Sequence, residues 1–185
     1  MNPPAATPQA ASPTVAVWGL GQRLGHWLLA GSVIGCWVLH EGGPWHVRLG
    51  YLALGIALLR TLAGALGPPP MRFGAFVRSV AATLAYTRML RDGAAPRYLN
   101  HNPLGAWMVL ALLVSALVAG GSGALYDTDA FWGDPLVWAV HQVSAWAFVA
   151  LVPLHLAGVL LSSRAHRENL VWAMITGRKR APARH

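Results

Sequence analysis

The segment HQVSAWAFVALVPLH, residues 141–155, begins and ends with histidine and contains no charged residue. Its two histidines are 14 residues apart, which on a helix is a rotation of about 1400°, within about 40° of four full turns. Both rings therefore share one helix face, ~21 Å apart along the axis. Ligands of a single metal ion lie within a few ångström of it, so His141 and His155 belong to two separate sites.

The composition around this segment is that of a membrane protein. Of the 185 residues, 55% are hydrophobic and 11% are charged, whereas a soluble domain has about 25% charged residues. Four apolar stretches approach or reach the ~20 residues that cross a bilayer. In lipid they must be helical, because their backbone polar groups need internal partners. The sequence therefore predicts an all-α fold, an integral membrane four-helix bundle, with helices over 24–40, 47–66, 104–125 and 136–162.

The rest of the chain divides around this bundle. Residues 1–17 are rich in Pro and Ala and carry no charge, which predicts a disordered amino-terminal segment. Residues 18–165 form the transmembrane domain. Within it, the connection 67–102 mixes Phe, Val and Leu with regularly placed Arg, as in an amphipathic helix on the inner leaflet. Residues 166–185 form a basic tail, for which anchoring to anionic membrane lipid is expected.

Charge is distributed unequally over the two ends of the predicted bundle. The loops 41–46 and 126–135 contain no Lys or Arg but hold four of the six acidic residues. The positive-inside rule then makes both termini cytoplasmic. The net charge of +8 is thus a topology signal, and we expect no nucleic-acid partner. The basic residues on the side of the termini are Arg23, Arg72, Arg78, Arg88, Arg91, Arg97, Arg164, Arg167, Arg178, Lys179, Arg180 and Arg184.

The single cysteine, Cys36, lies within the first apolar stretch. One cysteine excludes an intrachain disulfide. It also excludes a haem attached through a pair of thioethers and an iron–sulfur cluster held by this chain alone.

Each histidine of the opening segment needs a partner from another helix at the same depth. Because successive helices run in opposite directions, His26 is level with His155 and His46 is level with His141. Two neutral imidazoles that face each other across a bundle suit the two axial positions of a haem iron. Interfacial histidines bound to headgroups are the alternative, which two depth-matched pairs disfavour. On spacing alone, His40 could replace His46, since it also lies 14 residues after His26.

Five stretches carry a family likeness: RLGHWLLA, HVRLGY, NHNPLGAWMVLALL, VHQVSAWAFVALVPLH and ENLVWAMITGRKR. In this order and spacing, over about residues 18–181, the chain resembles the bacterial cytochrome b561 and nickel–iron hydrogenase b-type cytochrome family. The resemblance implies an integral cytochrome that binds two non-covalent haems b and passes electrons between membrane quinone and a redox partner.

The family pattern has one ligand histidine in the first helix, one in the second just before a Gly-Tyr pair, and two in the fourth. It favours His46 over His40, because Gly50 and Tyr51 follow His46 and nothing similar follows His40. By that likeness the haem iron ligands are His26, His46, His141 and His155.

Three further residues are candidates for cofactor binding. Arg23 and Arg48 each lie close to a proposed ligand and could pair with anionic haem propionates. His101 stands where the third helix begins, after which Asn102 can cap that helix and Pro103 can open it. At this position His101 could hydrogen-bond quinone or a haem propionate, although a surface histidine in a cap has the same sequence signature.

The resemblance implies a multi-pass protein of the bacterial inner membrane, working in a respiratory chain. It would exchange electrons between quinone or quinol and a periplasmic or membrane-bound redox protein such as a c-type cytochrome. The alternative is a haem-relay anchor subunit of a larger oxidoreductase such as a hydrogenase. A transporter is disfavoured by the paired histidines and the lack of a broken helix. A homodimer is compatible with the sequence.

Overall fold

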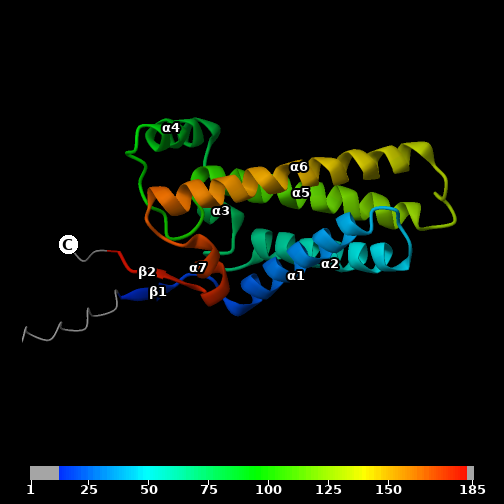
Figure 1. Cartoon of the computed structure of the whole chain (residues 1–185), viewed down its shortest axis with the longest axis horizontal. Helices are drawn as coiled ribbons and strands as arrows, with labels where there is room; N and C mark the ends of the chain where they lie inside the picture. The colour runs from blue at the N-terminus through cyan, green and yellow to red at the C-terminus, as the bar shows by residue number, and fades with distance from the viewer. Residues whose placement is uncertain (1–12, 183–185) are drawn as a thin grey trace, which may run out of the picture.

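The computed structural model describes residues 13–182 of the chain. Its long helices form an elongated bundle, in which α5 and α6 lie along one side and α1 and α2 along the other (Figure 1). Close packing joins α5 to α6, α2 to α5, and α1 to α2. The predicted all-α membrane bundle is confirmed, with long helices α1 (Leu20–Val38), α2 (Pro44–Leu66), α5 (Pro103–Tyr126) and α6 (Pro135–Ala165).

Local capping chemistry sets where three of these helices begin. Pro44, Pro103 and Pro135 are each the first residue of a helix, where a missing N–H costs nothing. Asn102 Oδ1 accepts the Gly105 N–H at 2.7 Å, which confirms the predicted cap of α5. Asp134 Oδ1 caps α6, accepting two backbone N–H groups at 2.9 Å each.

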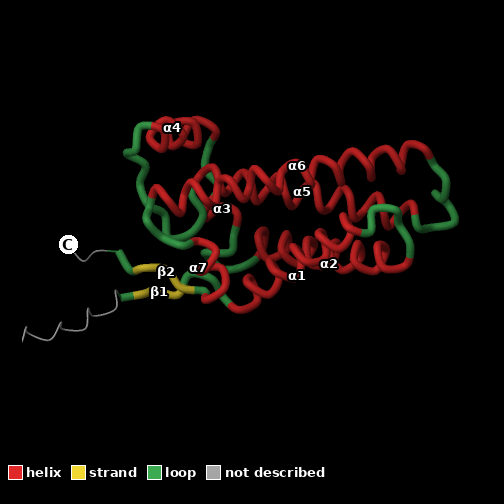
Figure 2. The backbone as a smooth tube through the Cα atoms, viewed as in Figure 1, coloured by secondary structure: helices red, strands yellow, loops and turns green. Residues whose placement is uncertain are grey.

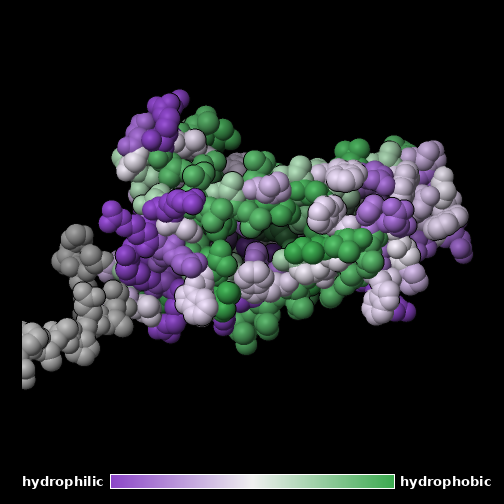
Figure 3. All heavy atoms as spheres, in the orientation of Figure 1, coloured by the Kyte–Doolittle hydropathy of each residue, from purple (hydrophilic) through white to green (hydrophobic). Residues whose placement is uncertain are grey.

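The bundle surface is built for lipid. In the described part of the chain, α2, α5 and α6 are long and apolar enough to cross a membrane, while α1 is not among them. Gln22, Arg23 and His26 lower the hydropathy of α1. α1 nevertheless corresponds to the first membrane span that the sequence predicts, over 24–40. A hydrophobic middle lies between hydrophilic ends (Figure 3). Large apolar side chains such as Leu59 and Val143 are 69% and 71% exposed, which water would disfavour and hydrocarbon accepts.

We call the end of the bundle that carries both described chain ends the basic end. The opposite end, with the loops 39–43 and 127–134, is the acidic end. At the basic end the connection between α2 and α5 holds the short helix α3 (Phe73–Phe76) and the amphipathic helix α4 (Val80–Arg91). Thr83 and Tyr86 of α4 are buried, whereas its neighbours Val80 and Leu84 are exposed.

Two short strands at the basic end join the two described chain ends (Figure 2). β1 (Thr14–Ala16) pairs antiparallel with β2 (Arg178–Arg180), and Val15 lies opposite Lys179. The disordered segment predicted over 1–17 is therefore wrong for 14–16, and its residues 1–12 lie outside the described residues. The sequence held no signal for this pairing, because its partner strand is more than 160 residues away.

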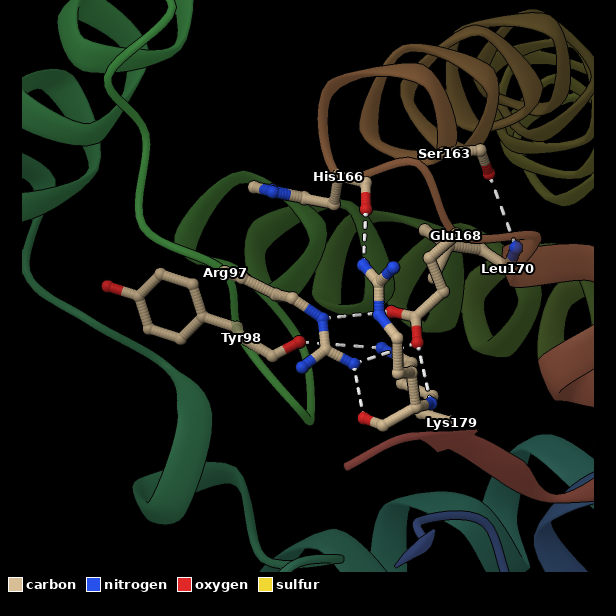
Figure 4. Close-up of polar contacts among 8 residues, drawn as sticks. Arg97, Tyr98, Ser163, His166, Glu168, Leu170 and Lys179 are labelled. Carbon is tan, nitrogen blue, oxygen red and sulfur yellow. Dashed lines mark hydrogen bonds and ion pairs between the residues drawn. The ribbon is translucent and has the colours of Figure 1, made fainter. Parts of the chain in front are cut away.

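An ion pair ties the same strands to the loop before α5. Arg97 binds Glu168 through two hydrogen bonds of 2.8 and 3.2 Å, and Glu168 also accepts the Arg180 N–H at 2.9 Å. Figure 4 shows Arg97, Glu168 and Lys179 converging here. Between Glu168 and β2 lies the helix α7 (Leu170–Thr176). We call β1, β2 and the Arg97–Glu168 pair the clasp.

Breaking the ion pair should open the clasp. The Arg97 and Glu168 side chains are 22% and 9% exposed, and loss of one partner from a buried pair costs about 3 kcal/mol or more. Glu168→Gln should therefore raise the trypsin cleavage rate at 178–180 by roughly a hundredfold, measured by mass spectrometry of the detergent-solubilised protein.

The exposed pair Arg91–Asp92 provides the matched control, since its side chains are 79% and 58% exposed. Exposed pairs contribute at most about 1 kcal/mol, so Asp92→Asn should leave the cleavage rate within a few-fold. Equal cleavage of the two variants would contradict the role given to Glu168.

Candidate functional site

Four of the predicted site histidines meet in two facing pairs. At the basic end, His26 of α1 faces His155 of α6, with ring centres 6.4 Å apart and ring planes at 54°. At the acidic end, His46 of α2 faces His141 of α6, with ring centres 6.1 Å apart and planes at 75°. These are the two pairs that the sequence predicts.

The spacing of each pair fits one metal ion between two imidazoles. An imidazole nitrogen binds a transition-metal ion at about 2 Å, and the ring centre lies about 1 Å farther, so facing rings have centres about 6 Å apart. Among the described residues no group of three His, Cys, Asp or Glu could hold a metal ion. Two axial protein ligands suffice for the iron of a haem, since the porphyrin supplies the other four.

Backbone carbonyl oxygens orient both rings of the acidic-end pair and select the tautomer of each. His46 Nδ1 lies 3.1 Å from both Cys36 O and Leu39 O, and His141 Nδ1 lies 2.8 Å from Ala119 O. A nitrogen facing a carbonyl oxygen must carry a proton, so in the neutral form of each ring the lone pair is on Nε2. Metal-binding histidines are oriented in this way.

A glycine of α5 makes room for the His141 ring. A Cβ at Gly123 would lie 3.0 Å from both Cε1 and Nδ1 of His141. The ring also stacks with Trp138 of its own helix, at 6.1 Å between centres and 29° between planes. Residues of α5 and α6 thus both contact the ring, and its Nδ1 donates to Ala119 O of α5.

His101, which has aromatic rings and cations around it, lies within electrostatic reach of His155 of the basic-end pair. His101 lies between Trp18 and Phe76, at 5.0 and 4.6 Å between ring centres. Its Nδ1 is buried and has no hydrogen-bond partner among the described residues. Burial, followed by the positive charges of Arg60 and Lys179 and the field of His155, lowers the pKa of His101 to about 3. His101 is therefore neutral at physiological pH.

The two predicted arginines have partners within the chain. Arg23 Nη1 donates to Ile175 O at 2.5 Å, while its Nε is buried and has no partner in the described part. Arg48 is exposed and its guanidinium lies 4.9 Å from the ring centre of Trp45. Arg23 thus joins α1 to the end of α7, and Arg48 stays at the surface of the acidic end.

His40 stands apart from the pairs. Its side chain is 66% exposed and lies 3.1 Å from Glu41. His46 instead faces His141, so the geometry supports the choice that the family pattern favours.

Sequence reasoning missed two basic residues near the basic-end pair. Arg60 lies in α2, with its guanidinium over the rings of Phe73 and Phe76. A lone arginine in an apolar stretch is a recognised sign of function, so that signal was present. Lys179 is buried, which follows from strand alternation and would have required the β1–β2 pairing to be known.

A family model described as prokaryotic cytochrome b561 matches residues 17–177. The chain belongs to this family. No curated protein and no solved structure matches the chain at a significant level.

Membership makes this chain a membrane b-type cytochrome, which transfers electrons and binds haem b. It associates with lipid and works with redox partners. Among its described residues, the two facing histidine pairs have the ring spacing that fits a metal ion between two imidazoles.

Substitution of Gly123 should disturb one haem site of this cytochrome. In Gly123→Ala the new methyl would require the His141 ring to shift by a few tenths of an ångström and strain its hydrogen bond to Ala119 O. If this pair binds a haem, its occupancy should therefore fall, measured by absorbance per protein. Gly121→Ala is the matched control, because a Cβ there meets nothing within 4 Å and alanine favours helix by about 1 kcal/mol. Full occupancy in Gly123→Ala would refute this account of the glycine.

Proposed function

We propose that the chain is a transmembrane electron-transfer cytochrome with two haems b. His26 and His155 hold one haem, and His46 and His141 hold the other. The observation that carries this proposal is the presence of two facing pairs, near the two ends of α6, with ring centres 6.4 and 6.1 Å apart. Haem supplies a one-electron carrier when bound, and the chain supplies ligands, orientation and an apolar environment.

Residues between the two pairs support transfer along the bundle axis. Phe148 lies seven residues from both His141 and His155, about two helical turns, so it shares their helix face. It is buried in a core cluster with Leu113 and small residues of α2 and α5. An apolar, tightly packed spacer excludes water from the interval between the two sites.

The charge pattern supports an orientation with the basic end in the cytoplasm of a bacterium, and hence a multi-pass protein of the inner membrane. Arg23 at the basic end and Arg48 at the acidic end are the proposed cationic partners of the haem propionates. The buried Nε of Arg23, which has no partner among the described residues, is a donor available for such a contact.

Exchange with quinone is proposed at the basic end, beside His101. A quinol releases protons as well as electrons, so it needs a proton-accepting or hydrogen-bonding group near one haem. His101 is neutral there, and its Nδ1 has no hydrogen-bond partner in the described part of the chain. At the acidic end, Glu41, Asp127 and Asp129 suit a redox protein with a basic docking surface, such as a c-type cytochrome.

The ligand assignment predicts single-haem losses. His141→Ala and His46→Ala should each remove the acidic-end haem, and His155→Ala and His26→Ala the basic-end haem. About half of the haem absorbance per protein should remain in each case, because the pairs are separate sites. His40→Ala is the control and should retain the full spectrum, since His40 is exposed and points to Glu41. Loss of a haem in His40→Ala, with none lost in His46→Ala, would overturn the assignment.

The quinone proposal predicts reduction without another subunit. Mixing the purified protein in liposomes with a short-chain quinol in a stopped-flow instrument should reduce the haems within seconds, followed by the haem α-band. His101→Leu should slow this at least tenfold and leave the haem content unchanged. If the wild-type protein is not reduced by a quinol of sufficiently low potential, electrons enter from a protein partner. The chain is then the relay anchor subunit of a larger oxidoreductase such as a hydrogenase.

A further inference from the structure

The clasp turns one basic side chain inward. In β2 the outer residues Arg178 and Arg180 are exposed, whereas Lys179 between them is 5% exposed. Successive side chains of a strand point to opposite sides, and Val15 of β1, opposite Lys179, fixes which side faces the protein. Pairing of two segments far apart in the sequence therefore places a positive charge inside the basic end.

Lys179 has no carboxylate partner of its own. Its Nζ donates to Tyr98 O at 3.5 Å, and no described carboxylate oxygen lies within 4.0 Å of it. Burial lowers the pKa of Lys179 and the nearby Glu168 opposes this shift, but the Glu168 oxygens already accept from Arg97 and the Arg180 N–H. Burial of an ammonium group without a counter-ion costs free energy. An effect of its positive charge on a neighbouring site would explain why Lys179 lies inside the protein.

Lys179 lies beside Trp18, the first of three successively contacting rings, Trp18, His101 and Phe76, which we call the aromatic column. Lys179 Nζ lies 5.8 Å from the ring centre of Trp18, and Trp18 contacts His101. His101 is in turn within electrostatic reach of both Lys179 and His155.

Arg60 adds a second positive charge beside Phe76, the last ring of this column. Its guanidinium lies 5.9 Å from the ring centre of Phe76, and Phe76 contacts His101. Arg60 also acts electrostatically on His101. No ion pair to a described carboxylate offsets the charge of Arg60 or Lys179, and both charges act on His101, which is itself within electrostatic reach of His155.

We propose that the clasp holds Lys179 as a fixed positive charge beside the haem bound by His26 and His155, and that this charge raises the reduction potential of that haem. The inference rests on the proposed function, since it needs a haem at this pair. Lys179 is a positioning residue in this role: it acts on the iron through space and binds neither iron nor substrate.

The sign follows from the electron balance. Ferric haem accepts one electron and becomes ferrous, so the site loses one unit of positive charge on reduction. A nearby cation repels the oxidised form more than the reduced form and so favours reduction. The acidic-end haem is ~21 Å away along α6, where the effect of Lys179 should be small.

The test is a redox titration of the holoprotein with Lys179→Met, which removes the charge and keeps much of the side-chain volume. The reduction equilibrium of the basic-end haem should shift about tenfold toward the oxidised form, ~59 mV for a one-electron couple. The acidic-end potential should stay unchanged. Lys179→Arg should retain the wild-type potential. Arg178→Gln is the matched control, since it removes the same charge from the exposed side of β2 and should shift neither potential.

Haem content is measured first, because it separates the proposed function, which requires bound haem, from the inferred effect of Lys179 on the haem potential. A wild-type protein without haem would refute the proposed function. Two haems in wild type and in Lys179→Met, with the basic-end potential shifted no more than in Arg178→Gln, would overturn this inference alone. If Lys179→Met does not assemble, Lys179→Gln, which can still donate to Tyr98 O, takes its place with the same expected shift and the same overturning result.

Discussion

The spacing of His141 and His155 on α6 is the constraint on which the rest of the bundle depends. Both rings share one face of a continuous helix, so that face must be opposed by other helices near both ends. α1 and α2 meet this demand with His26 and His46, because they run in opposite directions and reach opposite ends of the bundle. The fold thus places two imidazoles at each of two depths, and the proposed function depends on this geometry.

The two ends satisfy that requirement differently. At the acidic end, backbone carbonyls hold the Nδ1 protons of His46 and His141, so ligand orientation is built into the helix packing. At the basic end, the dominant feature is charge, since Arg60 beside Phe76 and Lys179 beside Trp18 both act on His101. Two chemically similar sites in one protein therefore lie in different electric fields, which is a physical basis for different potentials.

The helices and the histidine pairs could be predicted from the sequence, because hydrophobic length and periodicity report them directly. The choice between His40 and His46 as the partner of His141 needed the family pattern, because the sequence places both at the same depth as His141. The clasp could not be predicted. The tail RKR, read alone, is a solvated basic run, and only its pairing with Thr14–Ala16 makes the middle residue face inward. Glu168 likewise gave no sign that Arg97, 71 residues away, would be its partner.

The stoichiometry of haem to protein tests the central claim most directly. The pyridine haemochrome absorbance of the purified protein, divided by protein from amino-acid analysis, should give a ratio near two. All of that haem should be extractable by acid acetone, since the described pairs offer histidines and no paired thioethers. A ratio near one would mean that one of the facing pairs does not bind haem. A ratio near zero would contradict the account as a whole.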